Sequence, residues 1–452
     1  MNIIIVGFGK IGSSLAENLT REGHSVSIID RSPEVVKRAT EAIDVFGVVG
    51  NGAIHSTQIE AGVKEADLFI AVTPHDELNL LCCLIAKKNS NCATIARVRD
   101  PEYLSERGFI KDKMGLSSII NPEYEAAAEM CRLFCIPSAI EVDTFARGKV
   151  ELLKMALPKG SPIAGNSIVS ALGKFSGKIL ICAVERDGEV TIPTGSFVLK
   201  EGDEISFITS PSDAEGFFKK AGLDVGKIKR VLIAGGGKIS FYLAEMLLEY
   251  GFKVKIIEKD KERCEYLASV FPPSVMIING DCSDKQLLYE EGLDRVDGFA
   301  SITETDEENI MLSLFAGKHS KAKLVTKVSK NSFDEILDTL GVGSVISPKT
   351  ITSEMITSYV RAMNNSQGSN VQTLYKVVGG KVEALEFYAR TESEVTGIPL
   401  SDLDTKDDLL ICCISRNGKT VIPNGMTSIE KGDTVIVVTT QTGLNDLTDI
   451  IK

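Results

Sequence analysis

The sequence lacks several features that identify common classes of protein. Its longest apolar runs, such as LNLLCCLIA, fall well short of the roughly 20 residues that span a bilayer, so we expect core helices rather than membrane spans. The chain passes at once into an apolar strand-like segment, and we expect no signal peptide. A net charge of −12 argues against nucleic acid or an anionic lipid surface as the main partner. We therefore expect a cytosolic protein.

The cysteines also lack the spacing of a metal or disulfide site. Ten are present, but no C-x-x-C occurs, and Cys82–Cys83 and Cys412–Cys413 are adjacent pairs that are poorly placed to bridge each other. Cys131 and Cys135 would share one face of a helix, but zinc needs about two more ligands. We expect buried free thiols in a reducing compartment, and no metal site.

Glycine, in contrast, is placed with regularity near the N-terminus. The apolar run Asn2–Val6 is followed by Gly7, Gly9 and Gly12 in the spacing G-x-G-x-x-G, and helix-forming residues continue to Arg21. The first glycine allows a tight turn, the second lets a pyrophosphate approach the backbone, and the third lets the helix pack closely. The next strand, HSVSIID, ends in Asp30, which is placed to accept both hydroxyls of a ribose. The pattern predicts a dinucleotide-binding βαβ unit.

A second, less complete copy begins at KRVLIAGGGKIS. Gly235 and Gly237 match the first two glycines, Ser240 replaces the third, and Glu258 ends the following strand KVKIIE. Serine is small, so close helix packing is expected to survive with some loss. A second nucleotide site and a turn that keeps only the fold remain alternatives.

The two copies belong to a duplication of the whole chain. ADLFIAVTPHDELN aligns with VDGFASITETDEEN, and LICAVERDGEVTIPTG aligns with LICCISRNGKTVIPNG, at an offset of about 230 residues. Strand and helix patterns alternate through about 120 residues of each copy, which predicts an α/β fold with two Rossmann-like, doubly wound parallel sheets. A small α+β domain follows each sheet. The expected domains cover residues 1–122, 123–225, 226–348 and 349–452.

The small domains carry turn signals and follow a connecting helix. Asp187-Gly188 and Asn417-Gly418 lie between β-rich runs and predict hairpins, and LKEGDEISFI and IEKGDTVIVV each predict a turn followed by an edge strand. Helical segments from Pro122 to Phe134 and from Pro348 to Met363 carry apolar positions after each sheet is complete. We expect these segments to pack on another domain or another chain and so to support an oligomer, with packing within the same chain as the alternative.

The order IIIVGFGKIG, IID, GNGA, AVTPHDELN and IARV, followed by GDEISFI, resembles the cytosolic regulatory domains of potassium channels and transporters, called RCK or KTN domains. Two such units in one chain resemble the regulatory proteins of Trk-type potassium uptake. This resemblance implies binding of NAD(H), with ATP or ADP as an open alternative. It implies a homo-oligomeric ring, expected to be a tetramer, on the inner face of the membrane. It also implies a separate potassium-conducting subunit of the TrkH or TrkG type.

The same resemblance implies which residues bind the nucleotide. At the first site they are Gly7, Phe8, Gly9, Lys10, Ile11, Gly12, Asp30, Asn51, Thr73, Pro74 and Arg97. At the second site they are Gly235, Gly236, Gly237, Lys238, Ile239, Glu258, Asp281, Thr303 and Lys327. Glu304 stands where the first copy has Pro74, so the ligand of the second site stays open.

An NAD-dependent dehydrogenase with a duplicated cofactor domain is the alternative function. Such an enzyme needs an acid–base residue and a substrate domain that closes over the nicotinamide. Of the four histidines, only His75 is expected near the cofactor, and the second copy has Thr305 in its place. The motifs G-x-S-x-G, H-E-x-x-H and G-x-x-x-x-G-K-[ST] are absent. We therefore expect a nucleotide sensor without catalytic residues.

Overall fold

The structure is a computed structural model, which describes residues 1–145, 150–175, 177–223, 226–329, 337, 340–365, 371–377, 381–417, 419–441, 444 and 446–452. The chain forms two compact units. The parallel-sheet unit contains residues 1–134 and 228–357, and the antiparallel-sheet unit contains residues 135–227 and 358–452. The units divide within the two connecting helices, so each unit combines one part from both copies of the repeat.

The parallel-sheet unit contains two six-stranded parallel sheets, in the orders β3-β2-β1-β4-β5-β6 and β14-β13-β12-β15-β16-β17. The predicted doubly wound domains are therefore confirmed. The first domain consists of β1 (Asn2–Val6), α1 (Lys10–Arg21), β2 (Ser25–Asp30), α2 (Pro33–Ala42), β3 (Phe46–Val49), α3 (His55–Glu60), β4 (Leu68–Ala71), α4 (Asp76–Asn89), β5 (Ala93–Arg97), α5 (Pro101–Ser105), α6 (Arg107–Met114) and β6 (Ser118–Ile120). The second consists of β12 (Arg230–Ala234), α10 (Lys238–Glu249), β13 (Lys253–Glu258), α11 (Lys261–Val270), β14 (Met276–Asn279), α12 (Lys285–Glu290), η2 (Leu293–Arg295), β15 (Gly298–Ser301), α13 (Asp306–His319), β16 (Lys323–Lys327) and β17 (Ser344–Ile346).

The strand order positions the ligand site. The chain runs outward from β1 through β2 to β3, then returns to the other side of β1 with β4. The crevice at the carboxyl ends of these strands is where doubly wound sheets bind ligands. The central strands are buried on both faces, as Ile3–Val6 and Leu68–Ala71 show, because helices cover both sides of the sheet.

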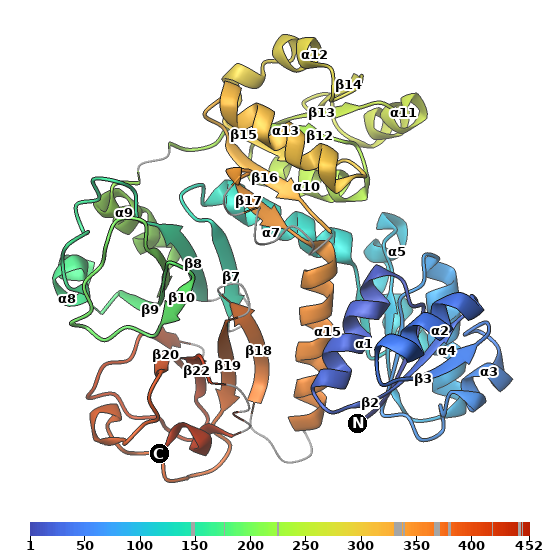
Figure 1. Ribbon diagram of the computed structural model, residues 1–452, viewed down its shortest axis with the longest axis horizontal. Helices are drawn as coiled ribbons and strands as arrows, with labels where there is room; N and C mark the ends of the chain where they lie inside the picture. Colours follow the sequence, from blue (N-terminus) through green and yellow to red (C-terminus); the bar gives the residue numbers. More distant parts are fainter. Residues whose placement is uncertain are drawn as a thin grey trace. The chain divides into compact units, whose positions relative to one another are not determined.

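The two connecting helices each contact the opposite parallel-sheet domain. Phe134 of α7 (Pro122–Cys135) is buried, and its ring lies so close to Gly298 of β15 that a β-carbon there would meet it at 2.8 Å. Asn18 of α1 donates a hydrogen bond of 2.9 Å to the hydroxyl of Ser353 in α15 (Pro348–Asn365). Figure 1 shows α15 beside α1. These apolar faces therefore pack on another domain of the same chain, and they give no argument for a ring.

The antiparallel-sheet unit contains two five-stranded sheets, ordered β10-β9-β11-β8-β7 and β18-β19-β22-β20-β21. The first half consists of β7 (Glu141–Phe145), β8 (Val150–Ala156), α8 (Ile168–Leu172), η1 (Gly173–Phe175), β9 (Ile179–Arg186), β10 (Glu189–Thr191), β11 (Glu204–Thr209) and α9 (Pro211–Ala221). The second half consists of β18 (Val371–Val377), β19 (Val382–Tyr388), η4 (Leu400–Asp402), β20 (Leu409–Arg416), β21 (Lys419–Val421), β22 (Thr434–Thr439) and η5 (Leu447–Ile450).

The hairpin at Asp187-Gly188 is confirmed. Both residues have positive φ, 53° and 81°, and β9 pairs with β10 directly across them. Asn417 also has a positive φ, of 52°, whereas Gly418 lies outside the described residues. The prediction of edge strands was wrong, because β11 and β22 are the central strands of their sheets. Their nearly continuous buried positions, Ile205 to Thr209 in β11, fit a strand with neighbours on both sides.

One hydrophobic cluster joins the two halves of the antiparallel-sheet unit. It contains Leu152, Cys182, Ala183 and Ile208 from the first half, with Val382, Ala384, Cys412, Cys413, Ile436 and Val438 from the second. The two small domains therefore share a core. Nine of the ten cysteines are buried, as expected, whereas Cys135 is exposed.

Among the residues that the structure describes, none of the helices combines the length and the apolar character needed to cross a bilayer. The same part of the chain contains no group of three or more metal-ligating side chains suited to a metal ion.

Candidate nucleotide site

The first glycine-rich turn has the geometry that its three glycines predict. Gly7 has a φ of +93°, which favours glycine, and a β-carbon there would come within 3.1 Å of the Thr73 backbone. No atom lies within 4 Å of the position that a β-carbon on Gly9 would take, so this side of the turn is open. A β-carbon on Gly12 would lie 2.0 Å from the Gly7 carbonyl oxygen. Only glycine at this position therefore lets α1 pack this close to β1.

Helix α1 begins at Lys10, between the second and third glycines of the turn. Gly9 is its N-cap residue, and no side chain caps the helix there. The first N–H groups of a helix have no partner within the helix, and the helix dipole is positive at this end. The turn therefore presents backbone donors to an anion such as a phosphate.

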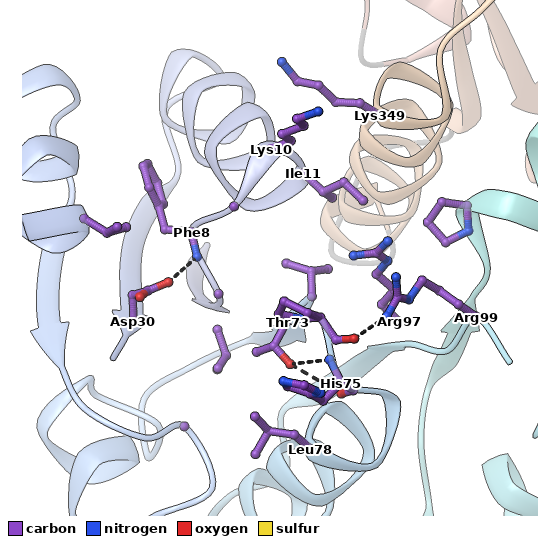
Figure 2. Close-up of a pocket in the computed structure, with 18 of the residues that line it drawn as sticks. Phe8, Lys10, Ile11, Asp30, Thr73, His75, Leu78, Arg97, Arg99 and Lys349 are labelled. Atoms are coloured by element: carbon purple, nitrogen blue, oxygen red, sulfur yellow. Dashed lines mark hydrogen bonds between the residues drawn. The ribbon is translucent and has the colours of Figure 1, made fainter. Parts of the chain in front are cut away.

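Asp30, at the end of β2, lies against this turn. Its Oδ2 accepts a 2.8 Å hydrogen bond from the backbone N–H of Phe8 (Figure 2). Its Oδ1 accepts one of 3.0 Å from the backbone N–H of Ser32. These two hydrogen bonds fix the carboxylate beside the phosphate turn. In dinucleotide-binding folds an acid at this position binds the hydroxyls of the ribose that is joined to the phosphates.

A buried asparagine joins the ends of β4 and β5. Asn79 accepts 2.8 Å and 2.7 Å hydrogen bonds from the N–H and hydroxyl of Thr73, and donates to the carbonyl oxygens of Thr73 and Arg97. Asn309 makes the same four contacts with Thr303 and Lys327 in the second copy. We did not select either asparagine from the sequence. Their signal is the final N shared by the aligned segments AVTPHDELN and SITETDEEN.

The first turn opens into a cavity of 670 Å³. Its lining includes all predicted first-site residues except Gly12, which lies beneath the turn: Gly7, Phe8, Gly9, Lys10, Ile11, Asp30, Asn51, Thr73, Pro74 and Arg97. The lining also includes His75, which was expected near the cofactor, and residues that the sequence did not indicate, among them Val35, Arg99 and Glu123.

The second parallel-sheet domain contributes to this same cavity. Ile239, Lys327 and Ser329 line it together with the first-site residues, and so do Pro348 and Lys349 at the start of the connecting helix α15. Figure 2 shows Lys349, at the start of α15, on the same side of the cavity as Lys10. Ile239 and Lys327, which we assigned to the second site, are thus placed at the first, whereas the other second-site residues are not in the described lining.

The cavity carries more positive than negative charge. Lys10, Arg31, Arg97, Arg99, Lys327 and Lys349 line it, against the carboxylates of Asp30 and Glu123. Arg97 and Glu123 pair at 3.2 Å. Burial lowers the pKa of Lys327, the carboxylate of Asp306 opposes this shift, and the nearby Lys10 lowers the pKa further. A bound anion would favour the charged form of these side chains.

The second turn has a similar backbone but different surroundings. Gly235 has a φ of +100°, and the Ser240 hydroxyl, in place of a third glycine, donates a 2.6 Å hydrogen bond to the Gly235 carbonyl. Glu258 accepts hydrogen bonds from the N–H groups of Gly236 and Asp260, as Asp30 does from its own turn.

Two further residues distinguish the second turn from the first. Arg263, where the first copy has Val35, donates to the carbonyl oxygens of Gly236 and Gly237 at 2.6 Å and 3.3 Å. Asp281, the counterpart of Asn51, accepts a hydrogen bond from the N–H of Ser283. The guanidinium of Arg263 therefore contacts the carbonyl oxygens of this turn, whereas Val35 lines the cavity at the first.

Comparison with known proteins identifies the family. The sequence profile of the TrkA-N domain matches residues 3–122 and 231–348, and that of the TrkA-C domain matches residues 152–222 and 385–452. The Trk system potassium uptake protein TrkA homolog of Archaeoglobus fulgidus is 34% identical over 438 residues, which is 97% of each chain. The chain belongs to the TrkA family. Trk system potassium uptake protein TrkA of Haemophilus influenzae is 29% identical over 442 residues, 97% of this chain and 95% of that one.

Among solved structures, the GsuK channel bound to NAD superposes with a TM-score of 0.63 at 17% identity, over 97% of this chain and 76% of that one. The GsuK RCK domain gives the same TM-score over 97% and 92% of the two chains. At this identity the likeness shows a shared fold. Membership of the TrkA family identifies the chain as a regulatory protein of potassium uptake. It is therefore not the dehydrogenase that we considered as the alternative.

Proposed function

We propose that the chain senses a nucleotide in the first cavity and thereby controls potassium uptake. One observation carries this proposal. The cavity at the first phosphate turn is lined by both parallel-sheet domains, with Lys10 from the first and Lys327 from the second, and by Lys349 of the connecting helix α15. A ligand that contacts both domains stabilises the conformation in which both domains touch the ligand. It shifts the conformational equilibrium by the difference between its affinities for the two states.

The ligand class follows from the chemistry of the lining. Backbone donors at the start of α1 and several cationic side chains suit phosphate groups, and Asp30 suits the two hydroxyls of a ribose. NAD(H) is the favoured ligand, and a protein of the same fold, the GsuK channel, is known with NAD bound. ATP or ADP presents the same ribose and phosphates, so either could occupy the same turn.

The proposed partner is a separate potassium-conducting membrane subunit of the TrkH or TrkG type. We place the chain in the cytoplasm, peripheral to the inner face of the membrane. We also propose a homo-oligomeric ring, expected to be a tetramer. Membership of the TrkA family supports these three points. The helices α7 and α15 give no separate support for a ring, because both contact other parts of the same chain.

The experiment joins a binding measurement to a transport measurement. Calorimetry with NADH and with ADP is compared for the unaltered chain, Asp30→Ala, and the matched control Asp44→Ala, in which an exposed acid of the same domain is removed. We expect Asp30→Ala alone to weaken binding and to blunt uptake at low external potassium. If Asp30→Ala folds, binds poorly and leaves uptake unchanged, nucleotide sensing is not how the chain acts. Conversion of the recovered ligand would restore the enzyme alternative.

A further inference from the structure

The second phosphate turn faces a carboxylate that comes from the first domain. Lys238 is the first residue of α10, where a phosphate on the turn would approach the helix. Its Nζ lies 3.1 Å from Oδ2 of Asp100, which follows β5 of the other domain. The two side chains are 37% and 40% exposed, so the pair lies at a partly solvated junction rather than in the core.

Asp100 is held in this position by its own backbone and by its neighbours. Its N–H donates a 2.9 Å hydrogen bond to the buried carboxylate of Asp76, and its Oδ1 accepts one from the N–H of Glu102 as the N-cap of α5. The adjacent carbonyl of Arg99 accepts a 2.9 Å hydrogen bond from the hydroxyl of Tyr242, a buried residue of α10. The loop that carries Asp100 is therefore hydrogen-bonded to α10, the helix that starts at the second phosphate turn.

The charge at this position is negative. Burial alone would raise the pKa of the Asp100 carboxyl, but the hydrogen bonds from Lys238 and Glu102 and the positive charges of Lys238 and Arg263 lower it overall. A phosphate at the start of α10 would meet this carboxylate as a like charge and would compete with it for Lys238. At the first turn the opposite domain contributes Lys327, and the connecting helix α15 contributes Lys349.

We propose that Asp100 is a specificity-determining residue that makes the two phosphate turns unequal, because its carboxylate holds Lys238 and disfavours phosphate at the second turn. The second turn then binds a nucleotide more weakly than the first, although its backbone is correctly shaped. This inference rests on the proposed function, since it assumes that the first cavity binds a nucleotide.

The test replaces Asp100 by asparagine in the full chain. Asparagine caps a helix as well as aspartate does, so Asp100→Asn removes the charge and keeps α5 capped. Glu102→Gln is the matched control, because it removes an exposed carboxylate two residues further along. Asp100→Ser, which also caps, is a second variant that guards against a folding defect specific to asparagine. Calorimetry with NADH and with ADP measures the number and affinity of sites in each variant.

We expect Asp100→Asn to tighten the weaker class of sites about tenfold, which corresponds to about 1.4 kcal/mol, and Glu102→Gln to leave it unchanged. Adding Glu258→Ala to Asp100→Asn should abolish this gain in affinity, whereas adding Asp30→Ala should leave the gain in place. Identical isotherms for Asp100→Asn and Glu102→Gln would overturn the inference while leaving the first site intact, and so would a gain that depends on Asp30. An unaltered chain that binds neither nucleotide would overturn the proposed function, and this inference with it.

Discussion

The third glycine of the first turn stands where no other residue fits: a β-carbon on Gly12 would lie 2.0 Å from the carbonyl oxygen of Gly7. We predict that Gly12→Ala forces α1 away from β1, lowers the free energy of unfolding by about 1–3 kcal/mol and abolishes nucleotide binding at the first cavity. Gly108→Ala is the control, because no atom lies within 4 Å of a β-carbon there. It lies in α6, where alanine should be neutral or slightly stabilising. Unfolding curves in denaturant measure both, and equal stability of the two variants would contradict the packing argument.

The second turn should respond differently to a change at the same position. Ser240 is fully buried and its hydroxyl is bonded to the Gly235 carbonyl. Ser240→Gly removes that hydrogen bond and places glycine in a helix, which should cost about 1–2 kcal/mol. If Ser240→Gly instead raised the free energy of unfolding, the serine side chain would strain the packing of α10 on β12 rather than fit into it.

Asp30 should set the preference for a ligand without a 2′-phosphate. The carboxylate is fixed by the N–H groups of Phe8 and Ser32, and a 2′-phosphate would bring a second negative charge to it. We expect NADH to bind more tightly than NADPH, and Asp30→Asn to reduce that difference about tenfold or more, with Asp44→Asn as the control. Competition between the two ligands measures the ratio. Equal affinities in the unaltered chain would show that Asp30 is misassigned or that Arg31 neutralises the phosphate.

Binding at the first cavity should weaken at alkaline pH. Burial lowers the pKa of Lys327 below its usual 10.5, so the side chain loses its positive charge earlier than an exposed lysine as pH rises. Affinity for a phosphate-bearing ligand should therefore fall as pH increases through this lowered pKa. Lys327→Arg keeps the charge and should remove the decline, whereas Lys111→Arg, at an exposed position, should not. Titrations with NADH across alkaline pH would test this, and a decline that survives Lys327→Arg would exclude Lys327 as its cause.

A second lysine should make stability depend on pH. Burial lowers the pKa of Lys323 to about 8, from 10.5. Between these values the unfolded chain binds more protons than the folded chain, so the free energy of unfolding should rise as pH increases from 8 to 10.5. Lys323→Met should remove that slope and stabilise the chain at neutral pH by up to about 3 kcal/mol. Thermal unfolding at several pH values is the measurement, and a slope unchanged by the substitution would contradict it.

The sequence predicted those parts of the site that lie close together along the chain. The turn and the acid at Asp30 follow from local spacing, because both come at strand ends of one βαβ unit. The residues at the ends of β4 and β5 were implied by the family resemblance instead. The contribution of Lys349 could not be predicted in this way, since it depends on how two domains separated by more than 200 residues pack.

The central position of β11 was missed for a related reason. Its pairing with β8 and β9 is set by the sheet as a whole, whereas the turn before it looks the same whether the strand is central or at an edge. The pairing of Lys238 with Asp100 belongs to the same class, because neither residue's local sequence refers to the other.

The junction between the two parallel-sheet domains has a consequence for the origin of such chains. In a dimer of identical protomers, symmetry places the same residue on both sides of the interface. A duplicated gene lifts that constraint, so one phosphate turn can face lysines while its twin faces Asp100. The covalent connection also keeps the two halves together at any protein concentration. Divergence after fusion could therefore weaken one copy of the ancestral site without dispersing the assembly that supports the other.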